Sequence, residues 1–466
     1  MSISNFENKG KNMNTISIIR LFSFALAGLL FFNSCTDVLD VRNEGQLSTE
    51  AALSDARSVN VAMSGIYSSL QGSLGSGIPA SPTEALAGDI VYAGSDYGYL
   101  EIWNQNMSLF TPSFSGFWDN SYRGMNAINN VLASLPDIKD LTDAQKSQIE
   151  GECKFIRGVM TFEMLRIWGH QYGHRADNSQ PGIIIRTAPT RGTNGLAISR
   201  SSVADCYKQV IEDLKASESL MNDTKRDGYA NKSAAQAYLA RVYFQMNDHA
   251  NAYAYADLIK KGGKFSLATT PRDVFYKGGN TESIFQMALT TQTNSFGAIR
   301  GMYQKTAFGE PPFTISKDFA DAIDASPASD LRKQHYIKQS GSTRYCTKYD
   351  TLIANVNVIR FAEILFIHAE SGLELGKPES EVLADVNLIR KRANVPEDNS
   401  TTGKAALLDL IGKERRLEMC FEGDRFHYLK RTKSSSIRGL AWNDNKLLAK
   451  IPSSEVSGNP GIELNP

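Results

Sequence analysis

The sequence predicts a mostly α-helical protein built from pairs of helices, with large irregular insertions and a few short strands. Apolar residues recur at the spacing of one helix face in four parts of the chain, and each time a second helix follows. A single pair cannot bury its own apolar stripes, so four pairs favour an array in which neighbours cover one another. A generic helical bundle is the alternative interpretation.

The composition is that of a globular protein with no excess of charge. Lys and Arg together number 50, as do Asp and Glu, and neither sign forms a long run. The chain therefore lacks the positive field that nucleic-acid binding requires, and we exclude nucleic acid as a partner.

The first residues are typical of an exported protein. Basic residues precede an apolar run at 21–32, which is too short to span a bilayer and has the length of a signal-peptide core. The small residue Ser34 stands before Cys35, which suits cleavage and lipidation of the cysteine. We expect residues 1–34 to be a lipoprotein signal peptide and Cys35 to carry an acyl anchor. A plain secretory signal is the alternative.

The first helix pair is expected over residues 48–135, with Ser48 as a candidate N-cap. The segment 72–115 lies between its two helices and is rich in Gly, Ser, Pro and aromatic residues. It is too long for a helix turn, so it indicates an inserted loop region that could carry function. The stripe of the first helix consists of Val59, Met63, Ile66 and Leu70.

The second pair is expected over residues 142–221. Thr142 is the predicted N-cap of its first helix, and Ser201 or Ser202 that of its second. A short β-like run at 183–185 lies in the connection. The first helix carries a continuous apolar stripe: Ile149, Cys153, Ile156, Met160, Met164 and Ile167.

The third pair spans 231–262, where Asn247 and Asp248 interrupt the apolar pattern and Gly262 ends the second helix. The fourth pair spans 358–396, with a turn at 376–378.

The second insertion, at 263–357, loses the helical period and gains Gly, Pro and aromatic residues. Residues 283–288 and 345–349 are possible strands within it.

The cysteines after Cys35 are widely spaced and include no C-x-x-C pair, so they predict neither a zinc site nor a disulfide scaffold. Small buried thiols are favoured over a bridge between Cys153 and Cys206. The residues concerned are Cys153, Cys206, Cys346 and Cys420.

The segment Glu414–Arg425 reads ERRLEMCFEGDR and resembles the signature E-R-R-x-E-L-x-F-E-G-x-R of the SusD/RagB family. Met419 replaces the usual Leu, and Tyr428 stands where Asp is common; both departures are modest. Further blocks resemble the family in the same order, at 34–40, 232–243, 359–370, 451–455 and 459–460.

This resemblance implies a right-handed superhelix of four tetratricopeptide-like pairs within a single domain at 35–466, whose signature region is 407–466. It also implies an outer-membrane lipoprotein facing the exterior, which hands a captured glycan to a TonB-dependent, SusC-like transporter. Some members of the family handle peptides instead, so a peptide ligand is an alternative.

Sugars are recognised by aromatic rings that stack on their C–H faces and by polar groups that bind their hydroxyls. The two insertions supply such residues, and the family's glycan site implies a role for the first of them. The candidates are Asp96, Tyr97, Tyr99, Trp103 and Asn104 in the first insertion, and Phe296, Arg300 and Tyr303 in the second. Trp118 and Tyr122 lie on a repeat helix, where packing accounts for them.

An enzymatic interpretation is weaker. Glu414, Glu418 and Glu422 recur every four residues and could supply paired carboxylates to a surface glycosidase. The Arg residues between them instead predict ion pairs that fix the helix. We therefore expect a binding protein with no catalytic residues and no cofactor.

His170, His174 and Asp177 have the residue types of a metal site, but Gly169 and Gly173 make a rigid arrangement doubtful, so no metal is predicted. A protein-only adaptor is the remaining rival, in which the aromatic residues of the insertions would be dispensable.

Overall fold

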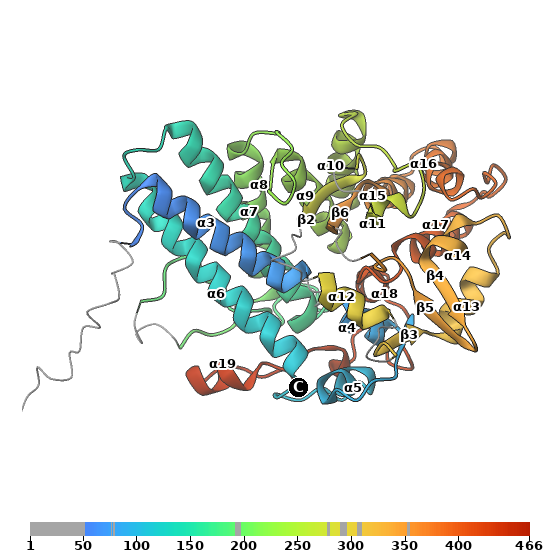
Figure 1. Cartoon of the computed structure of the whole chain (residues 1–466), viewed down its shortest axis with the longest axis horizontal. Coiled ribbons are helices and arrows are strands. Elements are labelled where there is room, and N and C mark those ends of the chain that lie inside the picture. Colours follow the sequence, from blue (N-terminus) through green and yellow to red (C-terminus); the bar gives the residue numbers. More distant parts are fainter. Residues whose placement is uncertain are drawn as a thin grey trace, which may run out of the picture. The chain divides into compact units, whose positions relative to one another are not determined.

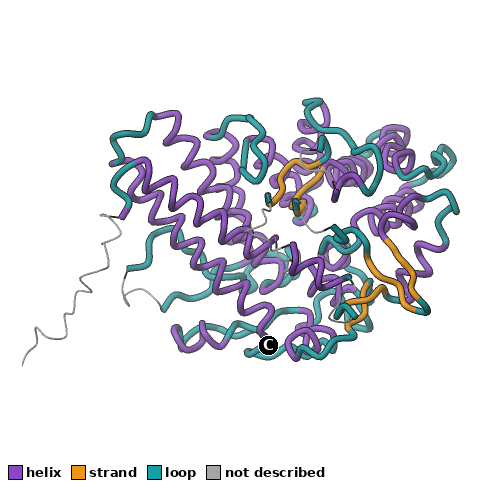
Figure 2. Tube along the Cα trace, in the orientation of Figure 1, coloured by secondary structure: helices purple, strands orange, loops and turns teal. Residues whose placement is uncertain are grey.

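Helices make up most of the described chain, which confirms the predicted fold class (Figures 1 and 2). The expected signal peptide, Cys35 and Ser48 lie outside the described residues, and those from Leu53 onward belong to one unit. The computed structural model describes residues 52–75, 77, 80–191, 197–276, 280–288, 296–304, 310–351 and 355–466.

The first two helix pairs consist of long helices with defined caps. Helix α3 (Ala56–Leu70) packs on α6 (Pro112–Ser134), and α7 (Asp143–Trp168) packs on α8 (Val203–Leu220). Thr142 and Gln145 form a capping box that starts α7, because each side chain accepts a hydrogen bond from a free backbone N–H of the first turn. Ser202 caps α8, as its sequence position predicted.

The third and fourth pairs are shorter. Helix α9 (Lys232–Gln245) packs on α10 (His249–Lys261), and α15 (Phe361–Glu374) packs on α16 (Glu379–Arg392). Contacts also join α6 to α7, α8 to α9 and α10 to α15, so each pair covers the next. The right-handed sense of a superhelix stays a prediction.

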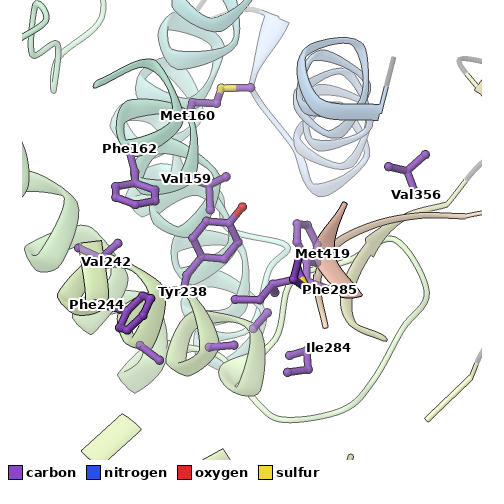
Figure 3. Packing of buried hydrophobic residues seen from close by; sticks show 14 of the residues in the cluster. Val159, Met160, Phe162, Tyr238, Val242, Phe244, Ile284, Phe285, Val356 and Met419 are labelled. Carbon is purple, nitrogen blue, oxygen red and sulfur yellow. The ribbon is translucent and has the colours of Figure 1, made fainter. Parts of the chain in front are cut away.

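The core between these helices is densely aromatic. Figure 3 shows Val159 and Phe162 of α7 near Tyr238 and Val242 of α9. Phe155 makes edge-to-face contacts with Tyr238 and with Phe285 of strand β2 (Ser283–Met287), at ring distances of 5.5 and 5.0 Å. Such pairs add to the stabilisation that burial alone provides.

The first insertion is more regular than expected. It contains a π-helix (Gln71–Gly75), helix α4 (Ala80–Ala87), strand β1 (Ile90–Tyr92) and helix α5 (Tyr97–Trp103). Its interpretation as a loop region was therefore wrong. Helix α4 packs on α18 (Asp424–Arg431), and this tertiary contact outweighs a composition that disfavours helices.

The strands of the described residues form three two-stranded antiparallel sheets. Strand β2 pairs with β6 (Val356–Arg360), β1 with β3 (Phe313–Ile315), and β4 (Ile337–Ser340) with β5 (Thr343–Cys346). The strand predicted at 283–288 is present. The one predicted at 345–349 was placed too late, and 183–185 takes part in no named strand.

Short helices complete the second insertion: α11 (Asp273–Tyr276), α12 (Phe296–Tyr303), α13 (Lys317–Asp324) and α14 (Leu331–Tyr336). The C-terminal region contains α17 (Lys404–Met419), α18, a 3₁₀ turn (Asn445–Leu447) and α19 (Ser453–Gly458). Trp168 at the end of α7 donates to the Lys450 carbonyl over 3.0 Å, which ties this region to the second pair.

The cysteines Cys153, Cys206, Cys346 and Cys420 are buried free thiols, as predicted. None of the helices in the described part of the chain is both long and apolar enough to cross a membrane.

Candidate functional site

Helix α5 carries most of the candidate residues of the first insertion. It begins after Asp96, whose carboxylate accepts a hydrogen bond from the Tyr99 backbone N–H over 3.0 Å. Gly98 lies against the first residue of α6: a Cβ there would come within 2.6 Å of Pro112 Cδ. The start of α5 is thus fixed to the start of α6.

A buried carboxylate organises the outer face of this helix. Glu101 is only 7% exposed and accepts hydrogen bonds from the hydroxyls of Ser108 and Thr111. Burial alone would raise its pKa, but these bonds and one from Tyr97 lower it. The same bond raises the pKa of the Tyr97 phenol. Glu101 therefore holds both the Tyr97 ring and the turn at 108–111.

Two aromatic rings close in sequence to Glu101 and the turn at 108–111 face solvent. Tyr97 is 67% exposed and Phe110 is 69% exposed, while Leu100, one helical turn after Tyr97, is 41% exposed. Phe110 donates its backbone N–H to Ser108 Oγ over 3.2 Å, so its position depends on the same turn. We call Tyr97, Leu100 and Phe110 the α5 platform.

Phe110 is not among the residues predicted from the sequence. Its only signal is an aromatic residue in a Ser-Leu-Phe-Thr stretch directly before the Pro that opens a helix. Nothing in that stretch tells an exposed ring from a buried one.

The other α5 candidates take different positions. Tyr99 points toward the interior, with its ring 5.2 Å from Phe313 and 5.9 Å from Tyr92, and burial raises its pKa to about 12. The Arg438 guanidinium lies 3.7 Å from the centre of the Trp103 ring, so one face of that indole is covered. Asn104 ends the helix and is exposed.

Of the candidates on α12, Tyr303 does not extend the platform. Tyr303 is 1% exposed and stacks on Tyr349 at 5.7 Å, so it is a core residue and offers no ring face to a ligand. Its assignment as a ligand contact was wrong. Arg300 is half-buried on the same helix, and the Phe296 side chain lies outside the described residues. Tyr303 and Tyr99 both reach Phe313, which joins α12 to α5 beneath the surface.

The signature glutamates form ion pairs, as predicted, but their partners lie outside the signature rather than among its own Arg residues. Glu414 pairs with Arg332 at 2.8 Å and with Arg390. Glu422 lies 2.7 Å from both Lys348 and Arg360.

Glu418 is fully buried between Arg360, at 2.8 Å, and Arg392, at 2.5 Å. Burial would raise the pKa of Glu418, but the two guanidinium groups outweigh it and hold that pKa far below its usual range. A general acid needs a raised pKa, so Glu418 is unsuited to protonate a glycosidic oxygen.

The signature also fixes the first insertion. Arg416 pairs with Asp89, next to β1, at 2.6 Å, and Gly423 donates its backbone N–H to Glu84 of α4 over 2.8 Å. Gly423 has φ 83°, and a Cβ there would lie 2.9 Å from the Ala80 Cα. Only glycine allows this approach without strain.

A small cavity near the signature is not a glycan site. Its volume is about 90 Å³, and Glu163, Arg241 and Asp424 are among its charged lining residues. This space admits a few water molecules but no sugar ring.

The histidines at the end of α7 stack on one another. The rings of His170 and His174 are parallel and 4.0 Å apart, whereas Asp177 is exposed and accepts from the Ser179 backbone. Within the described ranges, no group of three or more His, Cys, Asp or Glu side chains could hold a metal ion.

Comparison with known proteins gives matches along most of the chain. The SusD-like family, described as "Starch-binding associating with outer membrane", matches residues 39–244, and the SusD family (SusD and RagB) matches residues 332–453. Two proteins of Formosa agariphila named SusD-like are each 23% identical. One alignment covers 87% of this chain and 89% of the relative, and the other covers 98% and 99%.

Solved structures share the fold. A SusD superfamily protein from Bacteroides thetaiotaomicron superposes with a TM-score of 0.80 at 24% identity, covering 88% of this chain and all of that one. A structure described as a laminarin-binding SusD-like protein has a TM-score of 0.73 at 19% identity, covering 89% and 99%. The two family matches, the signature at Glu414–Arg425 and the shared helical fold agree, and the chain belongs to the SusD/RagB family.

Proposed function

We propose that the protein binds a glycan on the α5 platform at the outer face of the outer membrane and delivers it to a TonB-dependent, SusC-like transporter. The observation that carries this proposal is a pair of exposed rings, Tyr97 and Phe110, beside one buried carboxylate: Glu101 accepts hydrogen bonds from Tyr97 and from Ser108 and Thr111. Family membership supports it, as do the family's description and the laminarin-binding neighbour.

The geometry suits a sugar because the platform combines rigidity with polar neighbours. The Tyr97 phenol is anchored by Glu101, so its ring can stack on a C–H face with little loss of conformational freedom on binding. Asp96, Asn104 and Asn106 are exposed close to the two rings in sequence and can bind hydroxyl groups. Trp103 is half-buried with Arg438 over its ring, and the buried Tyr303 has no place in the site.

Capture without chemistry is the second part of the proposal. The signature carboxylates are bound by Arg and Lys side chains, and the most buried of them, Glu418, has a lowered pKa. A surface glycosidase would release shorter sugars, so chromatography of the glycan after incubation distinguishes the two functions. A peptide ligand on the same platform would appear as peptide binding that no glycan competes away.

The platform is tested by binding of the chain from Thr36 onward to a panel of polysaccharides that includes laminarin and starch. We expect saturable binding to at least one of them. Tyr97→Ala and Phe110→Ala should each weaken it about tenfold, because each removes one stacked ring. Titration calorimetry gives the affinities.

Tyr229→Ala is the matched control, since Tyr229 is also exposed but packs against Tyr67, away from α5. Equal affinities in all four proteins would rule out the α5 platform as the site. If no glycan binds, peptides and the transporter itself become the ligands to test.

Anchoring is tested through Cys35. We expect Cys35→Ala to abolish lipid modification, because the thiol is the acylation site, and to remove the protein from the outer-membrane fraction. Mass spectrometry of the N-terminal peptide and cell fractionation measure the two effects. An unchanged outer-membrane fraction would show that the anchor lies elsewhere.

A further inference from the structure

A second surface feature lies apart from the α5 platform, between helix α13 and the β4–β5 hairpin. It is a groove of about 400 Å³, which falls within the range of small-ligand sites. Strand β3 forms part of its wall through Thr314 and Ile315. The remaining lining is almost entirely polar and contains no aromatic residue among the described residues, so a ligand here would be held by hydrogen bonds.

Arg344 is the best-positioned donor in the groove. It pairs with Asp324 at 2.7 Å and donates to the Ala320 carbonyl over 3.3 Å, so its guanidinium is fixed in orientation. The hydrogen bond from Arg344 lowers the pKa of Asp324, which therefore stays an ionised acceptor. Two adjacent hydroxyl groups of a sugar fit this pair: one can accept a hydrogen bond from the Arg344 guanidinium, and the other can donate one to the Asp324 carboxylate.

The charged side chains that line the groove carry no net charge. Lys317 pairs with Asp321 at 2.6 Å, and Arg344 pairs with Asp324, so two cations and two anions line it. Each charge is balanced by its partner, so the groove offers no net electrostatic attraction to a charged sugar. A neutral polyol needs no such attraction and can use these groups as hydrogen-bond donors and acceptors.

The groove is structurally linked to the platform. Strand β3 pairs with β1, which precedes α5, and Tyr99 of α5 contacts Phe313 of β3. Paired strands lie about 4.8 Å apart, so β1, which leads into α5, and β3, which lines the groove, are direct neighbours. In Figure 1, α5, β3, β5 and α13 follow one another along the same part of the molecule.

We infer that this groove is a second subsite for the captured glycan and binds a neutral sugar unit through paired hydroxyl groups. The inference rests on the proposed glycan function and adds to it a polar site without stacking. It restricts the ligand to glycans with an uncharged unit that carries vicinal hydroxyls.

Hydrogen exchange with mass spectrometry tests the two sites separately. The chain from Thr36 onward is exchanged with and without each neutral polysaccharide of a panel: laminarin, starch, xylan and mannan. We expect slower exchange both in the α5 peptide and in peptides of α13 and the β4–β5 hairpin. Protection of α5 alone would contradict the groove as a sugar subsite and would leave the platform as the binding site.

The other outcomes are equally decisive. Protection of the hairpin alone would keep the groove as a sugar site and refute the platform. No protection anywhere, with every polysaccharide of the panel, would overturn both the groove and the proposed function.

Variants make the test quantitative. Asp324→Asn and Thr343→Val each remove one polar contact from the groove, and we expect each to weaken binding about tenfold. Thr343→Val keeps the shape of a half-exposed strand residue, so folding should be unaffected. Lys338→Ala is the control, because Lys338 lies on the same hairpin but does not line the groove. Unchanged affinity in both groove variants would overturn the inference.

Discussion

Replacing Arg360 by Met should lower the free energy of unfolding by about 3–5 kcal/mol, the range for removing one side of a buried ion pair. Arg360 is the common partner of three carboxylates: it lies 2.7 Å from Glu282, 2.8 Å from Glu418 and 2.7 Å from Glu422. These side chains are almost fully buried, so the substitution leaves negative charge in the interior with fewer partners.

Urea denaturation followed by circular dichroism measures this change. The control is Lys413→Met on α17, where Lys413 forms an exposed pair with Asp409 that contributes little to stability. The control should change the midpoint only slightly. Equal stabilities of the Arg360→Met variant and the parent protein would mean that the network is not needed to hold the signature region.

Stability should rise by about 2 kcal/mol between pH 7 and pH 9 through one residue, Lys430. Burial, together with the nearby Arg166 charge, lowers its pKa to about 7. Its ammonium donates to the carbonyls of Arg166 and Gly169 over 3.2 and 3.4 Å. These partners are neutral carbonyls, which do not offset the cost of burying the charge.

The rise in stability with pH follows from the number of protons that each state binds. Between pH 7 and the usual pKa of lysine, the unfolded chain holds a proton on Lys430 that the folded chain has lost, so raising the pH favours the folded state. Lys430→Met should remove this part of the pH dependence, because Met is apolar and does not titrate. Urea midpoints at pH 7 and pH 9 for both proteins give the difference. If the urea midpoints of the Lys430→Met variant and the parent protein change equally between pH 7 and pH 9, Lys430 keeps a nearly normal pKa.

Much of the fold could be predicted because it depends on local patterns. Thr142 and Ser202 start helices through their own side chains, and the apolar stripe beginning at Val59 faces the core as its spacing requires. The helices of the first insertion could not be predicted in this way. Helix α5 has only seven residues, too few for a periodic signal, and its position depends on contacts with Pro112 and with the turn at 108–111.

In the candidate site, too, features set by a local pattern could be predicted and features set by distant contacts could not. The interleaved charges at Glu414–Arg425 predicted that the segment forms ion pairs, but not their partners, because Glu414 pairs with Arg332 and Glu418 with Arg392, both outside the segment. The exposure of an aromatic ring depends instead on partners far along the chain. Tyr303 is buried by Tyr349 and Phe313, and Trp103 is covered by Arg438, more than 300 residues later. Such contacts leave no trace in the sequence around the ring itself.

The measurement that tests the central claim most directly is the affinity of the double variant Tyr97→Ala/Phe110→Ala for the polysaccharide that the parent protein binds best, with Tyr229→Ala as control. Chromatography of the glycan after long incubation belongs to the same experiment. We predict an affinity at least about 30-fold weaker in the double variant, unchanged binding in the control and an intact glycan. Unchanged affinity in the double variant, or shorter sugars released by the parent protein, would contradict capture by the α5 platform.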